Sequence, residues 1–169
     1  EQSVADFIQN ELRLLGAGPS AAEPIVGSGP YSAQPHYRPS KDKLIRQGDA
    51  IILDFGGTLS HYHSDMTRTV FLGEPGREFK KIYSIVRKAH DDAMAFAKPG
   101  VRCEDIDTVA RRVISDSGYG EYFIHRTGHG IGLEVHEEPY IVQGNTTILE
   151  PGMAFSIEPG IYIPGRYGV

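Results

Sequence analysis

Two aspartates lie on a stretch that is typical of a β-hairpin. Asp54 follows an apolar run at residues 51–53, and Asp65 comes eleven residues later in the expected return strand. If the turn is centred on Leu59 and Ser60, the two carboxylates stand directly opposite each other, with Cβ atoms about 5 Å apart. Like charges at that distance repel unless a cation joins them or one carboxyl group takes up a proton. The pair therefore predicts a cation site, and the alternative is a turn-forming Asp54 with a solvated Asp65.

A segment rich in glycine and histidine comes later in the chain. His129 lies between two glycines, and the missing Cβ atoms let a backbone or a substrate approach the imidazole closely. Histidine is a common ligand of divalent metals, and His136 follows seven residues later. A lone histidine is more often a hydrogen-bonded structural residue, and this description suits His125. The clustering favours a chemical role for His129.

A third acidic residue, Glu158, ends an apolar run just before Pro159 and Gly160. Taken alone, it is equally consistent with a capping acid in a turn. Two aspartates, a glutamate and a histidine together form an oxygen-rich set with one nitrogen, which suits Mn, Co or Zn better than a metal that prefers thiolates. His36 lies in a proline-rich stretch and taken alone indicates only a loop residue.

The elements that must position these side chains follow from the spacing of apolar residues. Helices are expected at residues 2–16, 77–97 and 104–117. Extended segments are expected at residues 25–28, 50–55, 61–72, 122–124, 140–142, 153–157 and up to 163, with an ordered loop over residues 29–46. Hairpins beside a helix pair, without a repeating strand–helix alternation, predict an α+β fold rather than a doubly wound sheet. No shift in composition marks a linker, so one domain over residues 1–169 is expected.

Composition limits the class of protein. The chain has 169 residues and a formal net charge of −5, which argues against a nucleic-acid or anionic-membrane partner. Its apolar runs are too short for a transmembrane helix or a secretory signal, so we expect no membrane partner and a cytoplasmic location. A single cysteine excludes an intramolecular disulfide and a cysteine-based zinc finger.

The start of the third helix carries a cysteine and several acids. A helix N-terminus can lower the pKa of a thiol, but a small structural residue is the favoured interpretation of Cys103. Glu104, Asp105 and Asp107 are interpreted as acids that complement the helix dipole.

The ordered set of motifs resembles that of the metallopeptidases with the pita-bread fold, which include Xaa-Pro aminopeptidases, prolidases and methionine aminopeptidases. The resemblance covers nearly the whole chain. The segment around His129 and the following His-Glu-Glu-Pro are shared with methionine aminopeptidases. Four pieces resemble the proline-specific branch: Ser28-Gly29, Pro35-His36, Asp65–Thr69 and Ser156–Tyr162.

The resemblance implies a curved antiparallel sheet covered by helices and a dinuclear metal centre. Four ligands of that centre would be Asp54, Asp65, His129 and Glu158, with Asp65 bridging two divalent ions. The family uses manganese or cobalt, and sometimes zinc. His36 and His136 match histidines that are not ligands but contact the scissile region.

The implied activity is hydrolysis of the bond between an N-terminal residue and proline, in dipeptides or in longer peptides. Glu158 would take a proton from the attacking water and pass it on, and His36 and His136 would stabilise developing charge. A methionine aminopeptidase is the second enzymatic interpretation. A non-catalytic peptide- or protein-binding module of the same fold is the third, although such relatives generally lose metal ligands.

The resemblance also implies a fifth ligand, a second bridging glutamate in a strand after residue 169. We therefore expect the C-terminal part of the catalytic domain to be missing from this chain and the chain alone to be inactive. The full-length protein could form a homodimer.

Overall fold

The computed structural model describes residues 1–18 and 23–169. The chain divides into two compact units, one formed by residues 1–76 with 162–169 and the other by residues 77–161. Helices and antiparallel strands fall in separate runs along the chain, which confirms the expected α+β class. The two units are called unit 1 and unit 2 below.

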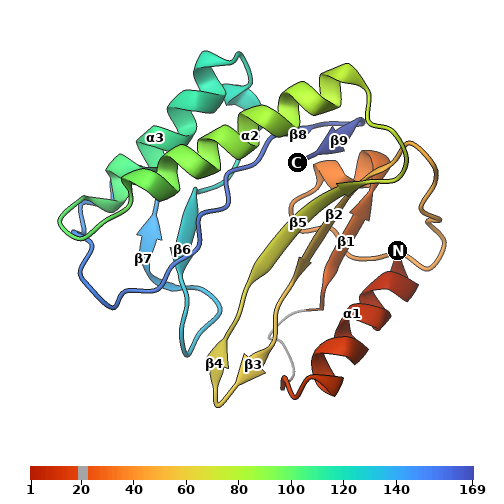
Figure 1. The fold of residues 1–169 in the computed structure, drawn as a ribbon, viewed down its shortest axis with the longest axis horizontal. Helices are drawn as coiled ribbons and strands as arrows, with labels where there is room; N and C mark the ends of the chain where they lie inside the picture. Colours follow the sequence, from red (N-terminus) through yellow and green to blue (C-terminus); the bar gives the residue numbers. More distant parts are fainter. Residues whose placement is uncertain (19–22) are drawn as a thin grey trace. The chain divides into compact units, whose positions relative to one another are not determined.

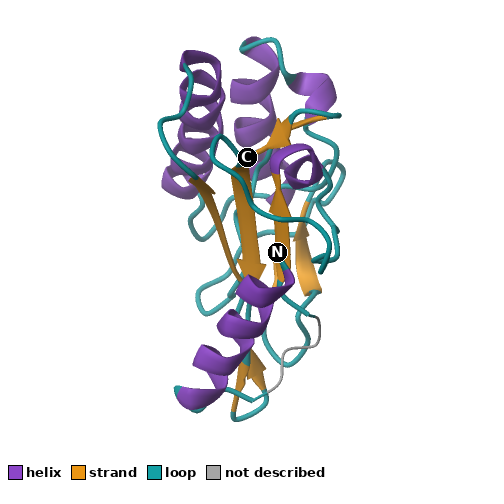
Figure 2. Cartoon of the chain, turned by 90° about the vertical axis from the view of Figure 1, so that its right-hand side faces the viewer, coloured by secondary structure: helices purple, strands orange, loops and turns teal. Residues whose placement is uncertain are grey.

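Unit 1 is a helix packed against a three-stranded antiparallel sheet (Figures 1 and 2). The sheet has the order β1-β2-β5. Ala5 of the helix, Val26 and Ile51 form its buried core, because the helix directs one apolar stripe inward. The elements are α1 (Gln2–Leu14), β1 (Ile25–Ser28), β2 (Ala50–Phe55) and β5 (Met66–Phe71). The bounds of α1, β1 and β2 agree closely with the expected ones, whereas β5 begins five residues later than the expected strand 61–72. Gly16, at φ 90°, provides the expected stop of the helix.

The hairpin between β2 and β5 has a different register from the expected one. Asp54 pairs with Thr67, and the short strands β3 (Thr58–Leu59) and β4 (Tyr62–His63) continue the same register to the tip. The turn is therefore centred on Ser60 and His61, which both have positive φ, as in a type I′ turn. The prediction that Asp54 and Asp65 stand directly opposite each other was wrong. Asp65 is instead a diagonal neighbour of Asp54, about 7–8 Å away between Cα atoms.

A gap in the ladder separates the hairpin tip from the main sheet. The Ser64 hydroxyl bridges this gap, because Oγ accepts a hydrogen bond from the Gly57 amide at 3.0 Å and donates to the Gly57 carbonyl at 3.2 Å. A Cβ atom on Gly56 would collide with the Ser64 carbonyl oxygen. Gly56 thus allows the strands to approach closely beside Asp65.

A buried glutamate ties three parts of unit 1 together. The Glu1 carboxylate is 7% exposed and accepts hydrogen bonds from the Ser28 amide and hydroxyl at 2.9 and 2.8 Å. It also accepts from the Tyr37 hydroxyl at 2.9 Å and from the Ser40 amide at 3.2 Å. These bonds fix the end of β1 and the expected loop, which begins with a short 3-10 helix, η1 (Gly29–Ala33). His36 lies in the part of the loop that Glu1 holds.

The last strands of the chain also belong to unit 1. β8 (Tyr162–Ile163) pairs with β9 (Tyr167–Gly168) across a turn that contains Gly165 at φ 72°. The Gly168 amide donates to the Ser32 hydroxyl at 2.9 Å. This bond attaches the final hairpin to η1.

Unit 2 consists of two helices and a short antiparallel strand pair (Figure 1). α2 (Arg77–Phe96) and α3 (Cys103–Asp116) pack side by side, and α3 also contacts β7. The strands are β6 (Gly128–Gly130) and β7 (Glu137–Ile141). Ile82, Ile106 and Ile114 are fully buried, as their helical spacing predicted.

Two expected strands of unit 2 are absent as such from the described structure. Residues 122–124 were expected to be extended, but residues 120–122 form a 3-10 turn, η2 (Gly120–Tyr122), directly after α3. Residues 153–157 were expected to form a strand, yet they make only one ladder bridge, between Phe155 and Gly130. The reason is that the Ser156 hydroxyl replaces a main-chain carbonyl as the acceptor of the His129 amide.

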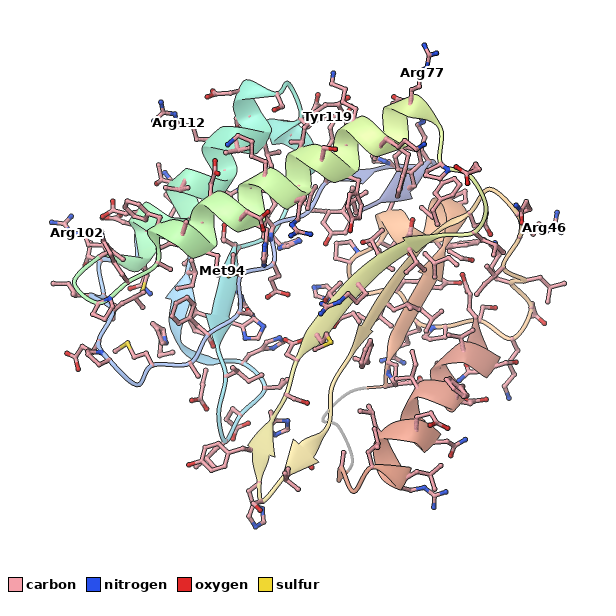
Figure 3. All side chains as sticks on the ribbon, viewed as in Figure 1. Arg46, Arg77, Met94, Arg102, Arg112 and Tyr119 are labelled. Atoms are coloured by element: carbon pink, nitrogen blue, oxygen red, sulfur yellow. The ribbon has the colours of Figure 1, made fainter. Side chains whose placement is uncertain are left out.

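The outer faces of the unit 2 helices are charged. Arg77 and Arg112 extend away from the helices (Figure 3), and Arg87 pairs with Asp91 one turn later at 2.8 Å. Exposed pairs of this kind contribute little to stability. None of the helices in the described ranges has the length and apolar composition that a bilayer crossing requires.

The bond between Glu1 and Tyr37 predicts an unusual tyrosine titration. Burial, together with the hydrogen bond to the Glu1 carboxylate, raises the pKa of Tyr37 to about 12. Because the folded-state pKa is raised, the stability that this phenol adds is complete below the unfolded pKa of about 10 and is lost as the pH rises towards 12. Absorbance at 295 nm should show a late tyrosine ionisation that Tyr37→Phe removes.

Glu1→Gln should lower the pKa of Tyr37, because it removes the negative charge. Glu11→Gln, on the exposed face of α1, is the matched control and should leave the titration unchanged. A late ionisation that persists in Glu1→Gln would contradict the assignment.

The single cysteine should be unreactive in the folded protein. Cys103 is fully buried at the start of α3, and burial, together with the negative charge of Glu138, raises its pKa. The favoured structural interpretation of this residue is confirmed, and no lowered thiol pKa is found. We expect iodoacetamide to alkylate the Cys103 peptide at least about tenfold more slowly in the native protein than in guanidinium, since the thiolate is the reactive form. Fast native labelling at pH 7, followed by peptide mass spectrometry, would contradict this.

Candidate metal centre

Residues 154–158 lie antiparallel to β6 and bring Glu158 beside His129. Three main-chain hydrogen bonds join the segments: Glu158 N to Thr127 O at 2.7 Å, Ser156 N to His129 O at 2.8 Å, and Ile131 N to Ala154 O at 3.1 Å. The donors and acceptors alternate as they do in a β-ladder. Residues 154–158 therefore act as an additional edge segment of the β6–β7 pair.

The glycines around His129 make this pairing possible. A Cβ atom on Gly128 would collide with the Ser156 carbonyl oxygen, and one on Gly130 would collide with the carbonyl oxygens of Glu137 and Glu138. Neither glycine has a positive φ, so each is needed for space rather than for backbone conformation. The expectation that missing Cβ atoms permit close backbone approach around the imidazole is confirmed.

The Ser156 hydroxyl connects the His129 backbone to the Glu158 side chain. Its Oγ accepts a hydrogen bond from the His129 amide at 3.0 Å, where a regular ladder would use a carbonyl oxygen. The same Oγ donates to Glu158 Oε1 at 2.9 Å. This exchange of partners explains why residues 153–157 do not form the full strand that the apolar pattern predicted.

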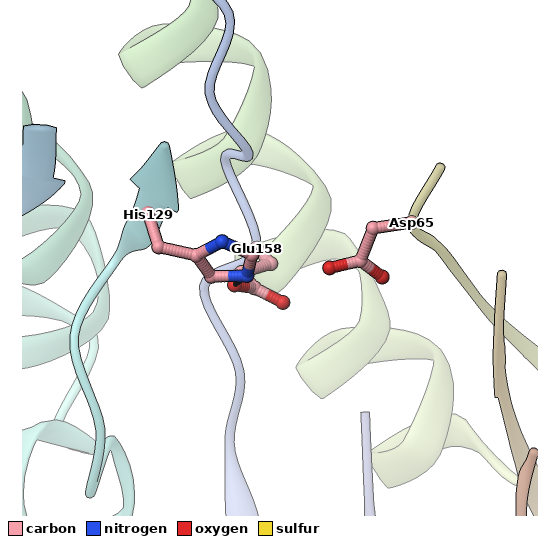
Figure 4. Close-up of side chains that lie close together, drawn as sticks. All are labelled: Asp65, His129 and Glu158. Atoms are coloured by element: carbon pink, nitrogen blue, oxygen red, sulfur yellow. Dashed lines mark ion pairs between the residues drawn. The ribbon is translucent and has the colours of Figure 1, made fainter. Parts of the chain in front are cut away.

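The His129 ring is held in one tautomer and faces a carboxylate. His129 is 2% exposed, and its Nδ1 lies 2.9 Å from the Gly130 carbonyl, which can only accept, so Nδ1 carries a proton. Nε2 lies 3.1 Å from Glu158 Oε1 (Figure 4). In the neutral ring two lone pairs would face each other there, so this position requires a cation, either a proton or a metal ion. The nitrogen and oxygen donors fit a divalent ion.

His136 lies next to His129 in unit 2. The two imidazole rings meet edge to face, with centroids 4.3 Å apart, and His136 is exposed. His125, which the sequence favoured as structural, contacts the Phe123 ring and lies 2.7 Å from the Arg126 carbonyl through Nδ1. The structure thus brings His136 into contact with the candidate ligand.

A buried ion pair on α3 holds the strand that carries His129. Asp107 is 1% exposed and binds Arg111 through two hydrogen bonds of 3.0 Å. Asp107 Oδ1 also accepts from the Thr127 hydroxyl at 2.7 Å and the Thr127 amide at 3.2 Å. Arg111 donates to the carbonyls of Phe123 and His125 at 3.1 and 3.0 Å. The interpretation of Asp107 as a dipole-complementing acid of the first turn was wrong.

The two aspartates belong to unit 1. Asp54 lies at the fifth position of β2, and Asp65 immediately precedes β5. Both side chains are half-buried, and the strand alternation puts them on the same face of the hairpin. Figure 4 draws Asp65 at the start of its strand. Their predicted role as metal ligands stays a prediction.

His36 is an exposed residue of unit 1. It follows Pro35 in a turn closed by the hydrogen bond from the Tyr37 amide to the Gln34 carbonyl, at 3.1 Å. The Tyr37 ring stacks on Tyr31 with centroids 5.0 Å apart. The loop is therefore ordered, as expected, and its role towards a substrate stays a prediction.

The polar residues that hydrogen-bond to the segments carrying His129 and Glu158 were not predicted from the sequence. Asp107 and Arg111 are four residues apart on one helix, which is the spacing of an ion pair, and this signal was available. Ser156 is two residues before Glu158 and so shares its face in an extended segment. Nothing in the local sequence indicates that Thr127 would receive both bonds from Asp107.

Known proteins resemble this chain over its whole length. Residues 1–169 match the metallopeptidase family M24. The chain is 45% identical over 169 residues to the Xaa-Pro dipeptidase of Pyrococcus furiosus, covering all of this chain and 48% of that protein. It is 55% identical over 145 residues to the probable dipeptidase PepE of Mycobacterium tuberculosis, covering 85% of this chain and 38% of that protein.

A solved structure agrees with the fold. The prolidase from Thermococcus sibiricus superposes with a TM-score of 0.97 at 50% identity, covering 99% of this chain and 46% of that chain. This likeness confirms the expected pita-bread architecture. The chain thus spans about half the length, or less, of the relatives that it matches. From its sequence and its fold, the chain belongs to metallopeptidase family M24.

Proposed function

We propose that the protein containing this chain hydrolyses the bond between an N-terminal residue and proline, as a dipeptidase or an aminopeptidase. The observation that carries this proposal is the pair formed by His129 and Glu158, whose facing lone pairs require a cation. Support for the substrate comes from relatives named Xaa-Pro dipeptidase, which match the chain from end to end.

Four residues are proposed as metal ligands: Asp54, Asp65, His129 and Glu158. Three carboxylates and one imidazole fit two divalent ions, with Mn or Co favoured over Zn because oxygen donors predominate. Such ions, when bound, supply Lewis acidity and lower the pKa of a water molecule. Proton transfer and binding of the scissile carbonyl are proposed for side chains of the chain itself.

Glu158 is proposed to move the proton. One oxygen of its carboxylate is fixed by Ser156, at 2.9 Å, so the group has a defined orientation. It takes a proton from the attacking water and delivers it to the leaving nitrogen. Delivery matters for this substrate, because the nitrogen of a bond to proline has no hydrogen of its own and leaves as an amine only after it gains one.

His36 and His136 are proposed to bind the scissile carbonyl. Each can donate a hydrogen bond to the oxygen on which negative charge develops. His136 is exposed, and its ring packs against His129, so its imidazole lies beside a proposed ligand. His36 is exposed on a loop that Glu1 keeps in place through Tyr37.

We further propose a cytoplasmic location, since a reduced buried cysteine suits a reducing compartment. The homodimer of the full-length protein stays a prediction.

The proposed activity is tested with the full-length protein and a panel of peptides. Xaa-Pro dipeptides and Xaa-Pro-Xaa tripeptides should be cleaved in the presence of Mn²⁺, and Met-Ala peptides should not. The ratio of the first two rates assigns the dipeptidase or the aminopeptidase class. Cleavage of Met-Ala alone would support the methionine aminopeptidase alternative, and no cleavage at all would support the binding module.

Removing the charge of Asp65 should weaken metal binding more than folding. At 4 Å and an effective dielectric constant of 20, a unit charge pair is worth about 4 kcal/mol, so Asp65→Asn in the full-length protein should lower Mn²⁺ affinity by roughly 10²–10³-fold. Calorimetric titration measures the affinity, and thermal melting of the metal-free protein measures stability. Asp42→Asn, exposed in the same unit, is the control. Parent-like Mn²⁺ affinity in Asp65→Asn would remove Asp65 from the ligand set.

Loss of the His136 ring should affect turnover rather than metal content. We expect His136→Ala to lower kcat on an Xaa-Pro peptide by roughly 10²-fold, as for a lost transition-state donor, with the bound Mn²⁺ unchanged. His90→Ala, at a half-buried position of α2, should behave like the parent protein. If metal analysis finds that His136→Ala has lost Mn²⁺, His136 is a ligand instead.

A further inference from the structure

The Ser156 hydroxyl hydrogen-bonds to both His129 and Glu158. It accepts from the His129 main-chain amide at 3.0 Å and donates to Glu158 Oε1 at 2.9 Å. A serine hydroxyl has one proton to donate, and Glu158 Oε1, at 2.9 Å, is a nearer acceptor than the His129 carbonyl oxygen, at 3.4 Å, so the bond to Glu158 leaves the oxygen lone pairs for the His129 amide. The two bonds therefore support each other.

The location of this hydroxyl is fixed from both sides. The Ser156 amide donates to the His129 carbonyl at 2.8 Å, and a Cβ atom on Gly128 would lie 3.2 Å from Ser156 Oγ. The serine is thus held against β6 by its own backbone, which keeps its hydroxyl beside the His129 amide and the Glu158 carboxylate.

Both contacts of the Glu158 carboxylate described above involve Oε1. Ser156 Oγ lies at 2.9 Å and His129 Nε2 at 3.1 Å from this atom. The hydroxyl therefore restrains rotation about the last bond of the Glu158 side chain. A free carboxylate loses rotational entropy when it binds a metal, and a prearranged one does not.

We infer that Ser156 is a positioning residue, which fixes the Glu158 carboxylate and the His129 backbone in the arrangement that receives a metal ion. The inference rests on the proposed function in taking His129 and Glu158 as ligands. Ser156 itself binds neither metal nor substrate. Groups that orient metal ligands typically contribute 10–100-fold to metal affinity or activity.

The test compares three variants of the full-length protein. Ser156→Ala removes the hydroxyl, Ser156→Thr keeps it, and Ser117→Ala removes an equivalent serine hydroxyl that binds the Val113 carbonyl at 2.8 Å at the end of α3. We expect Ser156→Ala to lower Mn²⁺ affinity in calorimetry by roughly 10–100-fold. Ser156→Thr should restore it to within about threefold, and Ser117→Ala should retain the parent affinity.

A second measurement does not need metal or substrate. Hydrogen–deuterium exchange of the peptide containing His129, in the metal-free protein, should be faster in Ser156→Ala than in the parent protein and in Ser156→Thr. Ser117→Ala should leave that peptide unchanged. This pattern separates the loss of one hydrogen bond from a general loss of stability, which would accelerate exchange throughout unit 2.

Parent-like Mn²⁺ affinity in Ser156→Ala would overturn the inference, and so would a Ser156→Thr variant as weak as Ser156→Ala. A parent protein that binds Mn²⁺ but cleaves no Xaa-Pro peptide would overturn the proposed function, while the affinity order of the variants would still support the role of Ser156. A parent protein without measurable Mn²⁺ affinity would overturn both.

Discussion

The backbone of residues 154–158 lies so close to β6 that position 128 has no room for a Cβ atom. The positions of His129 and Glu158 in unit 2 depend on this close approach. It lets Thr127 and His129 hydrogen-bond to the backbone of the segment that carries Glu158, so the imidazole and the carboxylate meet at 3.1 Å. Any side chain larger than hydrogen at position 128 would push the two segments apart and separate the candidate ligands.

The same strand is supported from its other side by a buried charge pair. Asp107 and Arg111 of α3 together bind Phe123, His125 and Thr127, so a helix fixes the backbone that leads into His129. A fully buried carboxylate is costly unless it is paired, and here its partner and the Thr127 groups satisfy it. Besides packing on the strands, α3 therefore fixes the position of the backbone that precedes His129.

Apolar periodicity predicted the helices and the main strands well, because burial decides where those elements form. The candidate ligands were selected on a different signal, because acids that end apolar runs and a histidine between glycines are unusual locally; their role as ligands stays a prediction. The failures have a common cause. The bonds of Asp107 and the irregular strand at residues 153–157 depend on side chains bonding to groups distant in sequence, and the turn at Ser60 and His61 depends on the register of the hairpin. Apolar periodicity contains no information about either.

The hairpin of unit 1 ends in a turn whose two central residues, Ser60 and His61, have positive φ without being glycine. Such residues favour this backbone less than Asn-Gly does, so the tip gains little from local preference. We expect strand pairing nearer the core to form first in folding and the tip to close afterwards. Asp54 and Asp65 would then reach a common face only once the sheet has formed, which would keep two like charges apart in the unfolded chain.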